Sequence, residues 1–254
     1  MFIQAITLFP EIFKSITEYG VTGRAHQKNI WRFSAINPRQ FADNKLGYID
    51  DRPFGGGAGM VMMAPPLFAA IGEAKKAFSG SLKNRVIYLS PQGKPLNHAK
   101  VQELAQLDNL VLLCGRYEGV DERVLEHAID EEISIGDFVV SGGELPAMML
   151  MDAVLLFRPN VLGDIESAQQ DSFVNGLLDY PHYTKPTEFQ GMKVPEVLKS
   201  GNHTLIAQWR LKQSLKRTLT RRPDLLEKRN LLPQEIRLLQ EIEQEAKATE
   251  QSIS

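Results

Sequence analysis

Apolar and polar positions in the first 160 residues alternate between two periods. Stretches with period two, or with unbroken apolar character, predict strands over residues 2–8, 30–36, 85–90, 110–114 and 131–135. Between them, helical spacing predicts helices starting at Pro10 and ending before Gly20, over 65–78, 98–107 and 121–127, and from Glu144 onward. Strands that alternate with helices in this way indicate an α/β fold with a mostly parallel sheet.

The pattern changes after residue 160. Residues 158–183 show no sustained period and are rich in Gly, Asp, Ser, Gln and Asn, which predicts a flexible linker. Beyond them, Asn202 is placed to cap a helix that runs to Arg217 or further, Pro223 to open a short helix and Pro233 to begin the last one. We therefore expect one domain over 1–160, a linker over 161–184 and a small all-helical domain over 185–254.

Composition and the apolar segments indicate the cellular compartment of the protein. The chain has 254 residues and one cysteine, Cys114, so no internal disulfide can form, which fits a reducing compartment. The first residues lack the basic leader and cleavage site of a signal peptide. The most apolar run, over residues 145–157, is too short to span a bilayer and contains Asp152. We expect a soluble, cytoplasmic protein without a membrane partner.

The net charge of the chain is −2, which indicates nothing about its binding partners. The distribution of charge is informative in the C-terminal part. Between Leu205 and Arg222 there are six basic residues and no acidic one. Arg210, Arg217 and Arg221 share one stripe of the predicted helix and leucines share another, which indicates an amphipathic helix with a basic outer face. This face is a candidate for RNA binding, and an ordinary solvated helix face is the alternative.

Three glycine-bearing loops follow or join the predicted strands, at residues 52–60, 114–123 and 133–146. Ligands of open α/β sheets bind at the carboxyl ends of strands, where glycines let backbone groups approach them. The loops lack the lysine of a P-loop and the GxGxxG of a dinucleotide site, which disfavours an NTPase or a dehydrogenase. One such loop is commonly just a tight turn, but three in one sheet favour a pocket.

The sequence gives little indication of a metal site or of a cysteine or serine nucleophile. The five histidines have no paired ligand spacing, so we expect no metal site. Cys114 ends a buried strand, which is typical of a small core residue rather than a nucleophile. The chain has no GxSxG nucleophile elbow.

Several long motifs, in order and at similar spacing, resemble those of the bacterial tRNA (guanine-N1)-methyltransferase family. They are GGGAGM, SPQGKPLN, LLCGRYEGVDER, EISIGDFVVSGGELPAMMLMDA, DSFVNGLLDYPHYTKP and the closing basic helices. The resemblance covers essentially the whole chain. It implies a SPOUT fold with a deep C-terminal trefoil knot over about residues 85–160, a homodimer, and a helical C-terminal domain that binds tRNA.

The resemblance also implies methylation by S-adenosylmethionine of N1 of the guanosine at position 37 of tRNA, 3′ of the anticodon. It places around the methyl donor Pro91, Gly115, Tyr117, Glu118, Ile135, Gly136, Asp137, Phe138, Val139, Val140, Gly142, Gly143 and Pro146. The residues themselves are compatible with this, because the glycines offer backbone groups and Ile135, Phe138 and Val140 offer apolar walls. A pocket without charge suits an adenosyl-sulfonium better than a triphosphate.

By the same resemblance, Asp171 in the DSF motif is the base that removes the N1 proton of guanine, acting across the dimer interface. By itself, an Asp before Ser in a polar segment is typical of a turn or cap. The family's usual arginine near the end of the knot helix is replaced by Leu156, and the neighbouring cations are Arg158 and Lys185. This departure leaves open a SPOUT enzyme acting on another RNA site, or a catalytically weakened RNA-binding homologue. Mg²⁺ assistance is implied only by the resemblance.

Overall fold

A five-stranded parallel sheet organises the N-terminal part of the computed structural model, which describes residues 1–78, 83–162 and 171–251. The strands are β1 (Phe2–Ile6), β2 (Arg32–Ile36), β5 (Asn84–Pro95), β6 (Asn109–Leu113) and β7 (Glu131–Ser134). Their order in the sheet is β2-β1-β6-β5-β7, and each neighbouring pair is parallel. The predicted α/β fold with a mostly parallel sheet is confirmed.

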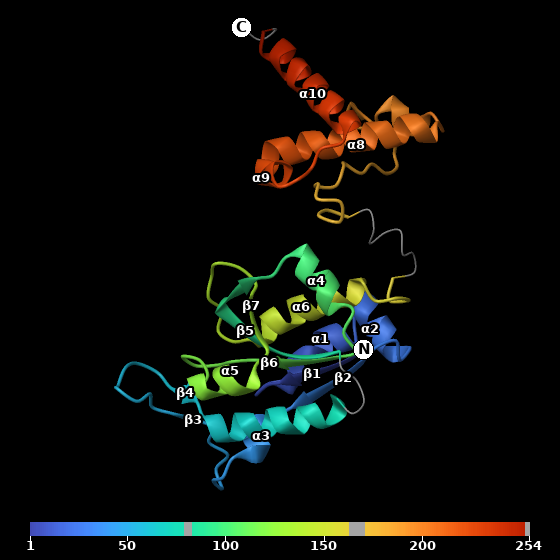
Figure 1. Cartoon of the computed structure of the whole chain (residues 1–254). Helices are drawn as coiled ribbons and strands as arrows, with labels where there is room; N and C mark the ends of the chain where they lie inside the picture. The colour runs from blue at the N-terminus through green and yellow to red at the C-terminus, as the bar shows by residue number, and fades with distance from the viewer. Residues whose placement is uncertain (79–82, 163–170, 252–254) are drawn as a thin grey trace. The chain divides into compact units, whose positions relative to one another are not determined.

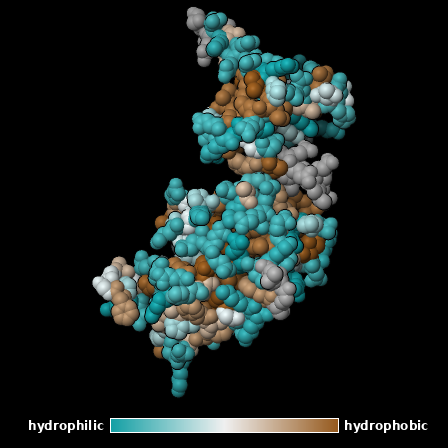
Figure 2. All heavy atoms as spheres, in the orientation of Figure 1, coloured by the Kyte–Doolittle hydropathy of each residue, from teal (hydrophilic) through white to brown (hydrophobic). Residues whose placement is uncertain are grey.

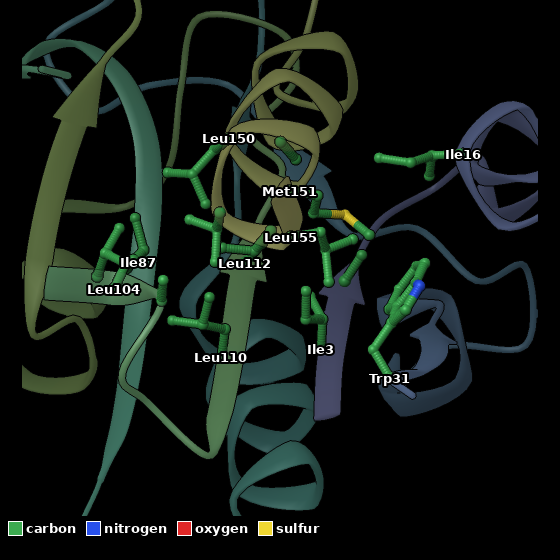
Figure 3. Packing of buried hydrophobic residues seen from close by; sticks show 14 of the residues in the cluster. Ile3, Ile16, Trp31, Ile87, Leu104, Leu110, Leu112, Leu150, Met151 and Leu155 are labelled. Atoms are coloured by element: carbon green, nitrogen blue, oxygen red, sulfur yellow. The ribbon is translucent and has the colours of Figure 1, made fainter. Parts of the chain in front are cut away.

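Strand β6 lies in the middle of this sheet and is buried along its whole length. Its residues alternate between the two faces, so Leu110 and Leu112 join one apolar cluster while Val111 and Leu113 join the other. Figure 3 shows the first cluster, in which side chains of the sheet meet Leu150 and Leu155 of a covering helix. Burial of each such leucine contributes about 1.5–3 kcal/mol.

Helices cover both faces of the sheet (Figure 1). The first cluster includes residues of α1 (Lys14–Thr17), α2 (Gly20–Gln27), α4 (His98–Leu104) and α6 (Glu144–Leu156). The second includes residues of α3 (Ala64–Lys75) and α5 (Glu122–Ala128). Both layers follow from the predicted elements, because their apolar stripes need a partner on the sheet.

The N-terminal helix differs from its prediction. Instead of one helix up to Gly20, the chain forms a short 3₁₀ turn, η1 (Pro10–Phe13), then α1, and Gly20 begins α2. Gly20 has φ +68°, a conformation open to glycine, and it redirects the chain between the two short helices. Two further 3₁₀ turns, η2 (Pro38–Phe41) and η3 (Lys76–Phe78), and the hairpin of β3 (Asp50–Asp51) and β4 (Val61–Met62) complete this part.

The chain divides into two compact units, Met1–Ile165 and Glu166–Ser254. The second contains a small hairpin of β8 (Glu188–Phe189) and β9 (Met192–Lys193) and the 3₁₀ turn η4 (Glu196–Lys199). Its helices are α8 (His203–Arg221), α9 (Pro223–Glu227) and α10 (Pro233–Gln251), which begin where Asn202, Pro223 and Pro233 predict. The Asn202 side chain accepts hydrogen bonds from the N–H groups of Thr204 and Leu205, so the predicted cap is confirmed.

Of the predicted linker, residues 161–184, the structure describes 161–162 and 171–184. Residues 163–170 lie outside the described part of the chain. From Asp171 onward the segment packs on α8: Leu177 is buried with Leu215 and Leu238, and the N–H of Leu178 donates to Thr218 Oγ1 at 2.9 Å. This stretch therefore packs on the helical unit through Leu177, an apolar contact that the polar composition of the segment does not indicate.

The most apolar segment forms α6, whose buried side chains include Leu150, Met151 and Val154. It covers the sheet, as its burial in the first cluster shows. Among the described residues, no helix combines the length and the apolar character that crossing a membrane requires.

Candidate active site

A pocket of about 200 Å³ lies at the ends of β6 and β7 and beside residues 88–91 within β5. Three segments form it: the part of β5 around Pro91, the loop 115–119 after β6 and the loop 135–143 after β7. Every residue predicted to surround the methyl donor lines this pocket except Asp137. The structure thus brings together Pro91, Gly115, Tyr117, Glu118, Ile135, Gly136, Phe138, Val139, Val140, Gly142, Gly143 and Pro146.

Eight further residues complete the lining: Tyr88, Leu89, Ser90, Arg116, Gly119, Ile133, Ser134 and Ser141. The last five lie within the glycine loops 114–123 and 133–146 noted in the sequence, whereas the three residues before Pro91 were missed because the sequence shows them only as part of a strand. Arg116 and Glu118 both line the pocket, which corrects the expectation of an uncharged pocket. The Arg116 guanidinium forms an ion pair with Glu144, with Nη2 2.7 Å from Glu144 Oε2.

Glycines allow the pocket loops to approach each other closely. A Cβ at Gly143 would lie 2.7 Å from Cys114 Cα, a contact that only backbone movement could relieve. The N–H of Gly143 donates to the carbonyl of Gly115 at 2.9 Å. The start of α6 is thereby joined to the loop after β6.

The first glycine loop, residues 52–60, does not line this pocket, contrary to the expectation that all three loops converge. It forms the tip of the β3–β4 hairpin, where Phe54 is fully exposed. The hairpin still supports the site, because the N–H of Glu118 donates to the Met60 carbonyl and the N–H of Met62 to the Gly119 carbonyl. These bonds hold Tyr117 in a left-handed conformation with φ +60°.

Two titratable side chains near the pocket stay protonated at neutral pH. Burial, with Glu132 and Glu122 nearby, raises the pKa of Tyr88 to about 12. Burial, reinforced by the Glu144 carboxylate, raises the pKa of the Cys114 thiol well above its usual range. Cys114 is fully buried, so its interpretation as a core residue is confirmed.

Asp171, the candidate base, belongs to the second unit, where its side chain is exposed. With Asp179, Tyr180, His203 and Arg210 it lines an open pocket of about 570 Å³ against α8. Next to this pocket, His182 Nε2 lies 2.6 Å from Asp179 Oδ2, and the Arg210 guanidinium stacks 4.8 Å from the Tyr180 ring centroid. Asp171 therefore lies among groups that suit a planar, hydrogen-bonding ligand.

The two cations considered as substitutes at the Leu156 position have other surroundings. Arg158 donates from Nη1 to the carbonyl of Ala105 at 2.7 Å, just after the last residue of α4. It thus satisfies a carbonyl at the C-terminal end of that helix, a structural task. Leu156 is the last residue of α6, and Lys185 is an exposed residue of the second unit.

The predicted arginine stripe on α8 is only partly an outer face. Arg210 and Arg221 are exposed, but Arg217 is half-buried and its Nη1 lies 3.4 Å from the carbonyl oxygen of Asp179. The stripe therefore borders the segment that carries Asp171 instead of facing only solvent. On another side of the helix, Lys212 Nζ forms ion pairs with Glu241 and Glu245 of α10 at 2.8 Å.

A metal site is not marked by clustered ligands. In the parts of the chain that the structure describes, no three His, Cys, Asp or Glu side chains gather closely enough to hold an ion. We therefore assign no residue to Mg²⁺.

Comparison with known proteins identifies the family of the chain. The family model described as tRNA (Guanine-1)-methyltransferase TrmD matches residues 1–228. A tRNA (guanine-N(1)-)-methyltransferase of Neisseria meningitidis serogroup C (strain 053442) is 72% identical over 245 residues, which cover 96% of this chain and 98% of the relative. Relatives with the same name from Dechloromonas aromatica (strain RCB) and Chromobacterium violaceum are 58% and 57% identical, over 97% and 96% of this chain and 98% and 97% of their own. The chain belongs to the TrmD family of tRNA (guanine-N1)-methyltransferases.

Proposed function

We propose that this protein transfers the methyl group of S-adenosylmethionine to N1 of the guanosine at position 37 of tRNA. The observation that carries the proposal is the pocket at the ends of β6 and β7 and beside residues 88–91 of β5, in a chain whose relatives are named for this reaction on guanine N1. The alternatives left open by Leu156, another RNA site or a weakened homologue, are outcomes of the experiment below.

The pocket fits the methyl donor in its chemistry. Ile135, Phe138 and Val140 offer apolar surface to adenine, and the glycines of the two loops expose backbone groups for polar contacts. Arg116 carries the basic group among the lining residues and is paired with Glu144, so it does not offer a free cation to a polyphosphate. When bound, S-adenosylmethionine supplies an electrophilic methyl group on its sulfonium.

Asp171 is the proposed base. Guanine N1 carries a proton at neutral pH and is a poor nucleophile, so that proton must leave as the N1–methyl bond forms and the carbon–sulfur bond breaks. The Asp171 carboxylate accepts the proton, and the donor leaves as a neutral thioether. A positioned base of this kind contributes about 10²–10⁴-fold to the rate.

The proposed RNA partner contacts the second unit. Arg210, Arg217 and Arg221 border the Asp171 segment, so phosphates held by them would bring an unstacked base toward the carboxylate. We assign residues 185–254 to a tRNA-binding helical domain on this basis.

We also propose that the working unit is a homodimer, as the resemblance implies. Support comes from a patch on the first unit, the apolar patch, formed by Phe9, Ile12, Leu145 and Met149. These side chains are 37–57% exposed, and η1, which carries Ile12, packs on α6, which carries Leu145 and Met149. Figure 2 shows apolar atoms at the surface of both units. A second copy of the chain is the occupant proposed for this patch.

The proposal extends to the threading of the chain in the first unit. We propose a deep trefoil knot over about residues 85–160, supported by two details of the strand ends. Strand β5 pairs with β7 on both sides of the segment 90–93, and the loop after β7 returns to Gly115. Cytoplasmic action is expected of an enzyme that modifies tRNA.

The experiment is methyl transfer from labelled donor to two unmodified tRNA transcripts that differ only in guanosine or adenosine at position 37. We expect label only on the first transcript, identified as N1-methylguanosine by nucleoside mass spectrometry. Equal label on both would indicate another RNA site. No label on either, with tRNA still bound, would indicate the weakened homologue.

A further inference from the structure

A buried carboxylate lies behind the donor pocket without lining it. Glu144, the first residue of α6, is 1% exposed. Its Oε1 accepts a hydrogen bond from Thr7 Oγ1 at 2.8 Å, and its Oε2 forms the ion pair with Arg116 Nη2 at 2.7 Å. Thr7, just beyond β1, is completely buried, and its Oγ1 also accepts from the N–H of Phe9 at 3.0 Å. Among the described residues neither Glu144 Oε2 nor Arg116 Nε has a hydrogen bond, so the cost of burying this carboxylate is offset by the ion pair at Oε2 and the hydrogen bond from Thr7 at Oε1.

Arg116 connects this carboxylate to both glycine loops of the pocket. It belongs to the loop after β6, yet its Nη1 donates to the carbonyl of Ser141 in the loop after β7 at 3.1 Å. A Cβ at Gly142 would lie 2.2 Å from Arg116 Nε, so glycine is the residue that leaves room for the guanidinium. The ring of Phe9 covers the guanidinium, with its centroid 4.6 Å from Cζ. One side chain thus contacts both loops and the start of α6.

Stability alone is a weak reason for such an arrangement, because apolar replacements of buried ion pairs are often neutral or stabilising. What the pair provides is a fixed geometry of the surrounding loops. Resting on the function proposed above, we propose that the Arg116–Glu144 ion pair, held by Thr7, positions the two glycine loops for the methyl donor. Arg116 and Glu144 are positioning residues, and their effect is on donor affinity.

The test is the substitution Glu144→Gln, which keeps the size of the side chain and its ability to accept from Thr7 but removes the charge. S-adenosylmethionine binding is measured by titration calorimetry on protein shown to be folded by circular dichroism. We expect the donor Kd and the donor KM to rise about tenfold or more, since small displacements of a binding group weaken a preorganised site. The KM for tRNA should stay unchanged.

The matched control is Glu131→Gln. Glu131 Oε2 lies 2.9 Å from Arg85 Nη1 and its Oε1 2.9 Å from Lys100 Nζ, in the same unit but away from the pocket lining. This variant removes ion pairs without touching the loops, so its donor affinity should equal that of the wild type. A Glu144→Gln protein with lower thermal stability but wild-type donor affinity would overturn the proposal.

If Glu144→Gln does not fold, the donor Kd of the variant Thr7→Val tests the proposal instead. This substitution preserves side-chain shape and removes the hydrogen bond to the same carboxylate, together with the one that Thr7 accepts from the N–H of Phe9. A smaller rise in donor Kd is expected, and an unchanged Kd overturns the proposal. Failure of the wild type to bind the donor would overturn the proposed function and this inference together. Normal wild-type binding with no effect of the variants overturns this inference alone.

Discussion

At the residue scale, the site depends on positions where a side chain would collide with its surroundings. Gly143 approaches the backbone of Cys114, and Gly142 gives room to Arg116. Neither requirement comes from a left-handed φ, because both concern close approach. The sequence shows these glycines as a cluster after a strand, but the atoms that they admit are visible only in the fold.

Gly142→Val is therefore expected to weaken donor binding strongly, because the new side chain displaces the Arg116 guanidinium from the Ser141 carbonyl. Titration calorimetry on the folded variant measures the effect. Gly72→Val is the control, since a Cβ at Gly72 meets no atom within 4 Å and this residue lies on α3, outside the lining. Equal donor affinity of the Gly142 variant and the wild type would contradict the proposed placement of the donor.

Cys114 gives a second prediction at this scale. Its thiol is fully buried, with a pKa raised by that burial, so the reactive thiolate is scarce in the native protein. Iodoacetamide at pH 8 should label the native protein far more slowly than protein unfolded in guanidinium chloride. Mass spectrometry of the modified chain measures both rates, and rapid labelling of the native state would argue against the packed core.

At the element scale, predictions from the sequence succeeded where a local signal marks a boundary. Asn202, Pro223 and Pro233 mark the starts of α8, α9 and α10, and the apolar run at 110–114 marks the buried strand β6. Predictions from the sequence were incomplete where contacts between residues far apart in the chain determine the position of a segment. The polar segment around Leu177 packs on α8, and the glycine loop 52–60 supports the site through the β4 backbone without lining the pocket.

The basic stripe of α8 leads to a prediction about tRNA binding. Replacing Arg210, Arg217 and Arg221 together by Ala should weaken binding and flatten its salt dependence, by about 0.7–0.9 in logarithmic slope for each phosphate that the variant no longer neutralises. Filter binding over a range of salt concentrations measures the slope, and donor affinity should be unaffected. Lys212→Ala is the control, because its ammonium is already paired with Glu241 and Glu245. An unchanged slope would shift the tRNA contacts to Arg24, Lys28 and Arg52.

At the scale of the whole molecule, the parallel sheet and its two helical layers follow from the order of the elements, but the proposed knot does not. General rules of chain connection disfavour knots, so no local pattern would predict one. Likewise, the apolar patch joins η1 and α6, which lie far apart in the sequence. Such a patch, proposed above as a surface for a second copy, becomes visible only when the chain is folded.

Met149→Glu tests the proposed homodimer. A carboxylate in the middle of an apolar interface lacks a partner there, so the variant should sediment as a monomer at concentrations where the wild type is a dimer. Leu232→Glu, at another exposed apolar residue in the second unit, should leave the dimer intact. A wild type that sediments as an active monomer would refute the assembly.

We propose that Asp171 removes the N1 proton of guanosine 37 as the methyl group is transferred. The most direct test of this proposal is the single-turnover rate of labelled methyl transfer, compared between wild type and Asp171→Asn, with Asp224→Asn as a control in the same unit. We predict label on N1 of guanosine 37 and a rate about 10²-fold or more lower in the Asp171 variant, with donor affinity and the control unchanged. A variant that keeps most of the wild-type rate, or label at another atom, would contradict the claim.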